Sequence, residues 1–169
     1  VMDNTALWKA LARDDVQVVA TDHCPFNFAG QKELGRDDFT QIPGGLPSIE
    51  LRLSLAYGFG VVAKRLSLPR WVEICCTAPA RLFGLYPRKG TLLPGADADI
   101  VLFDPEQRVR VTQERLHEQV DYTPYEGLHL YGGSVMTLAR GRVIACEGEF
   151  VGQVGAGRFL NRTLSENQA

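Results

Sequence analysis

A run of β-branched and apolar residues near the start of the chain ends abruptly in ionisable side chains. Residues 16–20 read VQVVA, which is typical of a buried strand, whereas the next three, Thr21, Asp22 and His23, are polar. In α/β proteins, chemistry sits where strands end at their carboxyl side, because loops converge there on a rigid frame. We therefore expect Asp22 at a pocket mouth, as a metal ligand, a general acid/base or both. The alternative is a turn carboxylate, with His23 bonded to a backbone carbonyl.

Composition argues against several classes of function. The 169 residues, 45% hydrophobic and 22% charged, suit one globular domain, or one domain with part of another. The net charge of -2 and the scattered Lys and Arg residues argue against a nucleic-acid or anionic-membrane partner. The longest nearly apolar stretch, residues 53–63, is shorter than the roughly 20 residues that span a bilayer. The cysteines lack the spacing of a disulfide framework and favour a reducing cytoplasm: Cys24, Cys75, Cys76 and Cys146.

The first half of the chain is predicted to be helical around a single strand. A short amphipathic helix precedes the strand at 16–20, and a polar, glycine-rich loop follows it at 26–45. Helical spacing resumes at Leu46 and continues to about residue 59. Further helices are expected to start at Ser67 and at Thr77, since each is followed two residues later by proline.

The hydrophobic period changes near residue 89. Short β-branched or alternating runs separated by turn residues predict strands at 100–103, 108–112, 135–139 and 143–146. The turn through Gly141 pairs the last two as a hairpin. We therefore expect a small antiparallel sheet, and we divide the chain into residues 1–88 and residues 89–169.

Four segments then carry a resemblance. They read VVATDHCPF (18–26), KELGRDDFTQIPGGLPSIELRLSLAY (32–57), TAPARLFGLYPRKGTLLPGADADIVLFDP (77–105) and VDYTPYEGLHLYGGSVMTLARGRVIACEGEFVG (120–152). Together, and in this order, they resemble the C-terminal part of the dihydropyrimidinases and D-hydantoinases, cyclic amidases of the amidohydrolase superfamily.

The resemblance implies an α/β fold of a particular kind. Residues 1–88 would form the end of a metal-dependent (β/α)8 barrel, with 16–20 as its last strand followed by helices. Residues 89–169 would add strands to a composite β-sandwich and form the C-terminal tail. The resemblance also implies a homo-oligomer, a tetramer in the family.

The resemblance further implies a dinuclear metal centre. The family holds two divalent ions, usually zinc, with histidines, a carboxylated lysine and one aspartate, and Asp22 matches that aspartate. Asp22 would also act catalytically, taking the proton of the attacking water and returning it to the departing amide nitrogen. The sequence has three histidines and no H-x-H motif. Most metal ligands are therefore expected upstream of Val1, in a longer enzyme.

The resemblance also bears on the substrate. The segment QIPGGLPSIE is similar to the family's substrate-contact segment, with Gly44 at the place of a usual asparagine and Gly45 beside it. Only their backbone could contact a substrate; the alternative is a tight turn before Leu46. Phe26 replaces a polar residue of dihydroorotases and favours a neutral ring, such as a dihydropyrimidine or hydantoin, over an anionic one.

Other classes of function stay open. A non-catalytic dihydropyrimidinase-like scaffold protein shares the fold, and dihydroorotases and allantoinases share the type of reaction. The strand-rich tail could also serve as an interaction module through its exposed edges.

Overall fold

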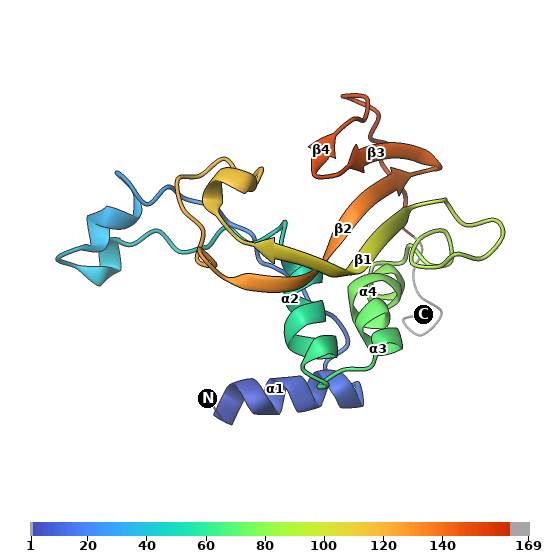
Figure 1. The fold of residues 1–169 in the computed structure, drawn as a ribbon, viewed down its shortest axis with the longest axis horizontal. Helices are drawn as coiled ribbons and strands as arrows, with labels where there is room; N and C mark the ends of the chain where they lie inside the picture. Colours follow the sequence, from blue (N-terminus) through green and yellow to red (C-terminus); the bar gives the residue numbers. More distant parts are fainter. Residues whose placement is uncertain (1, 163–169) are drawn as a thin grey trace.

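The computed structural model describes residues 2–162 as a layer of helices against one face of an antiparallel sheet (Figure 1). Helix α1 lies beneath this helical layer, and the segment between residues 24 and 45 projects to one side. The helical elements are α1 (Met2–Arg13), η1 (Lys32–Gly35), η2 (Phe39–Gln41), α2 (Arg52–Ala56), η3 (Tyr57–Val62), α3 (Leu68–Val72), η4 (Glu73–Thr77), α4 (Ala78–Leu82) and η5 (Gln113–Arg115). The strands are β1 (Ile100–Arg110), β2 (His129–Ala139), β3 (Arg142–Cys146) and β4 (Glu149–Phe150). A mixed α/β chain with an antiparallel sheet is thus confirmed.

The sheet has the strand order β1-β2-β3-β4. Strand β1 joins the two strands expected at 100–103 and 108–112 into one, with register irregularities against β2 on either side of Asp104. Pro105 lies inside the second irregularity, where its missing N–H costs no ladder bond. The hairpin between β2 and β3 turns through Arg140 and Gly141, both at positive φ, as a tight two-residue hairpin requires.

The helical layer consists of two continuous runs, each containing a π-helical turn. In the second run, Ser67 caps the start by accepting a hydrogen bond from the Arg70 N–H at 3.2 Å, as predicted. The short helix expected after Thr77 is present as α4, but it is not separate, because η4 carries the run into it without a break. Pro79 cannot bond the carbonyl four residues back, and the π turn accommodates it. That carbonyl, of Cys75, accepts from the Arg52 guanidinium at 3.3 Å.

The first helical run begins later than the sequence predicts. It starts at Arg52 and not at Leu46. Pro47 disfavours helical backbone at the residue before it, and Leu46 instead forms an isolated parallel bridge with His23. No helix within residues 2–162 combines the length and the apolarity needed to cross a bilayer.

Residues 16–20 have no regular secondary structure, so the strand predicted there is wrong for this chain. Within residues 2–162 no strand lies beside them to form a ladder, and side chains take over part of that role. The Arg70 guanidinium donates to the Val16 carbonyl at 2.9 Å, and Arg52 donates to the Val19 carbonyl at 3.1 Å. The Val19 N–H donates to a carbonyl of the second helical run, that of Ile74, at 3.3 Å. These hydrogen bonds hold the run against the helices.

The main core lies between the helices and the sheet. Ile74 is fully buried, and Trp71 packs with Tyr57 and with Phe103 of β1, at ring-centroid distances of 5.3 and 4.9 Å. This cluster joins residues on both sides of the boundary predicted between 88 and 89, and the two-domain division stays a prediction. A second cluster, Leu51 with Val111 and Leu130, anchors the start of α2 to the sheet.

The burial of Ile74 makes a test of this core. Ile74→Ala removes a fully buried side chain, so we expect the free energy of unfolding to fall by about 2–5 kcal/mol. Val72→Ala, two residues away and 44% exposed, should cost about 0.5 kcal/mol or less. Urea unfolding followed by tryptophan fluorescence measures both, and equal losses would contradict this placement of the core.

Candidate active site

Asp22 is exposed and lies at φ 47°, in the left-handed region that few non-glycine residues adopt. Such a conformation costs about 1–3 kcal/mol and persists only where the flanking structure fixes it. Within residues 2–162 the Asp22 carboxylate has no hydrogen bond and no ion pair. The alternative expectation, a turn carboxylate bonded to backbone amides, is therefore not what the described residues show.

The residues on either side of Asp22 are fixed by a second segment. His23 and Leu46 form a parallel bridge, and the Cys24 N–H donates to the Leu46 carbonyl at 3.3 Å. The buried Ser48 hydroxyl donates to the Thr21 carbonyl at 3.1 Å. Because Leu46 directly follows Gly45, the structure brings the glycine loop beside the segment that carries Asp22.

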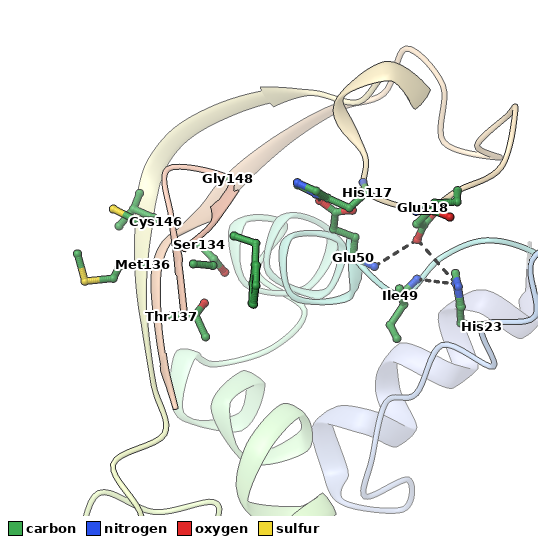
Figure 2. Close-up of a pocket in the computed structure, with 14 residues that line it drawn as sticks. His23, Ile49, Glu50, His117, Glu118, Ser134, Met136, Thr137, Cys146 and Gly148 are labelled. Atoms are coloured by element: carbon green, nitrogen blue, oxygen red, sulfur yellow. Dashed lines mark hydrogen bonds and ion pairs between the residues drawn. The ribbon is translucent and has the colours of Figure 1, made fainter. Parts of the chain in front are cut away.

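His23 makes the strongest connection between these segments. Its Nδ1 accepts hydrogen bonds from the backbone N–H groups of Ser48, at 3.0 Å, and Ile49, at 3.2 Å. An Nδ1 that accepts must carry its proton on Nε2, so the ring is neutral in this arrangement. Oε1 of Glu118 lies 3.8 Å from the same Nδ1 (Figure 2), a distance at which two acceptors are neighbours and not partners. The predicted contact with a backbone carbonyl is thus replaced by contacts with amides.

Gly45 and Gly44 differ in what their positions require. Gly45 lies at φ +128°, and a Cβ there would stand 2.4 Å from the Cys24 carbonyl oxygen. Only glycine fits that close approach. Gly44 faces open space, with nothing within 4 Å of where its Cβ would be.

A cation that the sequence analysis missed lies beside this loop. The Lys32 ammonium donates to the carbonyls of Pro43 and Gly45, the latter at 2.6 Å, and stands 5.4 Å from the centroid of the Phe26 ring. The two carbonyls use two of the three N–H groups of the ammonium. Nothing in the spacing of Lys32 indicates these contacts, because they depend on how the loop folds back.

The loop predicted at 26–45 is more ordered than its composition indicates. It contains η1 and η2, and its start is tied to the C-terminal half of the chain by Asp121. The Asp121 carboxylate accepts from the N–H groups of Phe28, at 2.5 Å, and Ala29, at 2.9 Å. The hydrogen bonds from Ala29 and Phe28 lower the pKa of Asp121, so the carboxylate that holds the loop stays ionised near neutral pH.

Two cavities flank the Asp22 position. One, of about 610 Å³, has His23, Glu50, His117 and Glu118 in its wall. The other, of about 510 Å³, is lined by Thr21 among others. Asp22 lines neither cavity, although each of its sequence neighbours lines one, so the described residues do not place it at a pocket mouth.

His117 lies exposed, and it is paired with Glu50. Its backbone N–H donates to Glu50 Oε2 at 2.7 Å, and its Nδ1 lies 2.9 Å from Glu50 Oε1. The hydrogen bond and charge of Glu50 raise the pKa of His117. Sequence spacing did not indicate this pair, since its members are 67 residues apart.

A carboxylate oxygen without a partner is a ligand that divalent cations accept, so Asp22 fits a place in a metal site. Within residues 2–162, however, no group of three or more His, Cys, Asp or Glu side chains is placed to hold a metal ion. The described part of the chain therefore does not contain a complete metal centre.

Comparison with known proteins shows the family to which the chain belongs. The Amidohydrolase family matches residues 2–145. A D-hydantoinase of Streptomyces coelicolor is 49% identical over 161 residues, which make up 95% of this chain and 34% of that protein. A D-phenylhydantoinase of Escherichia coli O1:K1 is 44% identical, over 96% of this chain and 35% of that protein.

Solved structures agree as well. The D-hydantoinase of Bacillus sp. AR9 superposes with a TM-score of 0.92 at 50% identity, over 96% of this chain and 36% of that one. The dihydropyrimidinase of Brevibacillus agri NCHU1002 has a TM-score of 0.91 at 47% identity, over 94% of this chain and 34% of that one. The chain thus spans about a third of the length of the proteins it matches. It belongs to the amidohydrolase family, within the group that contains the D-hydantoinases and dihydropyrimidinases.

Proposed function

We propose that this chain is the C-terminal part of an enzyme that opens the cyclic amide bond of dihydropyrimidines or hydantoins by hydrolysis. The observation that carries the proposal is the Asp22 carboxylate, which has no partner among residues 2–162 and is held in a strained backbone conformation beside a glycine loop. Strain of this kind persists where the surroundings impose it and is common at functional sites. The relatives named hydantoinase and dihydropyrimidinase support the choice of reaction.

In this proposal Asp22 is a ligand of one of two divalent metal ions, preferably zinc. The remaining ligands come from residues outside this chain, in keeping with its span of about a third of its relatives. When bound, such a pair of ions supplies activated water and polarises the amide carbonyl. The lack of any competing partner for Asp22 within residues 2–162 leaves both carboxylate oxygens available.

Asp22 itself moves the proton. A carboxylate at this position accepts the proton of the attacking water and returns it to the amide nitrogen, which must be protonated to leave. The segment pairing through His23 and Leu46 limits how far the carboxylate can move between these two tasks. The left-handed backbone sets the direction in which the side chain leaves the chain.

The substrate is proposed to be a small neutral ring that contacts the backbone of Gly44 and Gly45. Phe26, whose ring lies 5.4 Å from the Lys32 ammonium, offers no group that would bind an anionic ring. A Gly45 carbonyl that bonds Lys32 keeps a second lone pair for a ligand.

The rest of the fold follows the same proposal. Residues 1–88 complete a (β/α)8 barrel, with 16–20 pairing as its last strand once neighbouring strands are present. Residues 89–169 contribute strands to a β-sandwich, although 163–169 lie outside the described residues. The complete enzyme is proposed to be a cytoplasmic homotetramer, in keeping with four cysteines that form no disulfide within the described part of the chain.

Asp22→Asn in the complete enzyme tests the central role. The amide cannot accept and return a proton, so kcat should fall by about 10²–10⁴-fold on dihydrouracil or a hydantoin. Bound zinc, measured by plasma mass spectrometry, should also fall. Asp37→Asn, a change of an exposed carboxylate in the neighbouring loop, is the matched control and should keep parent activity.

Parent-like turnover in Asp22→Asn would contradict the proposal. So would a complete protein that binds no metal and hydrolyses no cyclic amide, an outcome that would favour a scaffold role.

Gly45→Ala and Gly44→Ala test whether the two glycines contribute differently to the reaction. At Gly45 the added Cβ would meet the Cys24 carbonyl at 2.4 Å, so the loop must move. We expect kcat/KM to fall by about tenfold or more, because displacement near the reacting groups is costly. Gly44→Ala, in open space, should change kcat/KM much less. Equal effects in steady-state kinetics would show that the close approach at Gly45 does not matter for the reaction.

A further inference from the structure

The segment from Ser48 to Glu50 is held on both sides. On one side, the N–H groups of Ser48 and Ile49 donate to His23 Nδ1, at 3.0 and 3.2 Å. On the other, the Glu50 carboxylate accepts from the backbone N–H of His117 at 2.7 Å and pairs with the His117 ring at 2.9 Å. Because these residues are consecutive, any shift of Glu50 moves the two amides that hold His23.

The pairing of Glu50 with His117 has a defined direction. A carboxylate only accepts hydrogen bonds, so His117 donates from Nδ1 to Oε1 as well as from its backbone N–H to Oε2. A two-point contact fixes the orientation of the Glu50 side chain as well as its position. The Glu50 N–H also donates to Glu118 Oε1 at 3.3 Å (Figure 2). The backbone of Glu50 is therefore held as well as its side chain.

The pair lies outside the packed core. The side chains of His117 and Glu50 are 61% and 33% exposed, whereas Ser48 beside them is buried. Exposed ion pairs contribute little to global stability. A contact so placed affects the local geometry of the segment more than the stability of the fold.

We propose that Glu50 and His117 are positioning residues of the active site: through the Ser48 and Ile49 amides they fix the His23 ring, and thereby the backbone that presents Asp22. The inference rests on the proposed function, because it assigns the two residues a part in that reaction. Neither residue touches the reacting atoms in this proposal. They lower the cost of keeping Asp22 in its strained conformation.

The charges around His117 favour its pairing with Glu50. The groups that face His117 or share its cavity wall are Glu50, Glu149, Glu118 and His23, and three of these are carboxylates. The Glu50 hydrogen bond is the largest cause that raises the pKa of His117 above its ordinary value of 6.5. The charged pair is therefore complete below pH 6.5 and weakens as pH rises through the raised pKa.

The test uses the complete metal-loaded enzyme with Glu50→Ala, Glu50→Gln, His117→Ala and the Glu50→Ala/His117→Ala double variant. Glu50→Ala should lower kcat about tenfold while changing KM less than about threefold. Glu50→Gln, whose amide oxygen can still accept from the His117 N–H, should recover part of the loss. The double variant should be no slower than Glu50→Ala, because both changes remove one interaction.

Amide hydrogen exchange supplies a readout other than activity. The peptide spanning residues 44–51 should exchange about tenfold faster in Glu50→Ala, with an unchanged melting temperature. In the parent, its protection, corrected for intrinsic exchange, should fall as pH rises above 6.5, and His117→Ala should abolish that pH dependence. Glu114→Gln, an exposed carboxylate on η5, is the matched control and should behave like the parent.

Two results would overturn the inference. One is a Glu50→Ala enzyme with parent kcat and parent exchange. The other is a loss of activity that follows only a lower melting temperature, since that is a purely structural role. If the parent itself hydrolysed no cyclic amide, the proposed function would fail, and the exchange data would still decide whether Glu50 holds the two amides.

Discussion

The hydrogen bonds from the Ser48 and Ile49 amides to the His23 imidazole are the interaction on which the candidate site depends. They place an uncharged ring between two segments of chain that no regular secondary structure joins. Without them, the bridge between His23 and Leu46 and the hydrogen bond from the Ser48 hydroxyl to the Thr21 carbonyl would have to hold the two segments together. The free carboxylate of Asp22 is thus available because its neighbours, and not Asp22 itself, make the contacts.

Residues 16–20, the segment before the site, are held by hydrogen bonds from side chains in place of a neighbouring strand. Arg52 and Arg70 occupy carbonyls of residues 16–20 that a neighbouring strand would otherwise bond. Burial alone would lower the pKa of Arg70, but its hydrogen bonds to Glu73 and Asp14 raise it, so the guanidinium stays charged. Both arginines come from the helical runs that pack on the main core around Ile74. The position of the site therefore depends on that core.

Local pattern predicted much of this fold. The antiparallel sheet, the hairpin turn at Gly141 and the cap at Ser67 all follow from short-range signals, and the structure has them. The strand predicted at 16–20 is not formed because a strand needs a neighbouring strand to pair with, and no such strand is present within the described residues. The helix does not start at Leu46 because Pro47 disfavours helical backbone at the residue before it. The helix after Thr77 is present as α4, but the π turn before it joins it to the preceding helix, which local spacing did not indicate.

The site was predictable in part. A polar cluster after an apolar run indicated Asp22, whereas its place beside Gly45 depends on the bridge between His23 and Leu46 and was not predicted. Lys32, Glu50 and Asp121 were not predicted, since each acts through a partner distant in sequence and no local spacing encodes such contacts. A crystal structure of the complete protein, with anomalous data at the zinc edge, tests the central claim most directly. It should place a metal about 2.0–2.2 Å from an Asp22 oxygen, with His23 Nδ1 still accepting from the two amides. A metal bound elsewhere, with Asp22 turned toward solvent or paired with an arginine, would contradict the account.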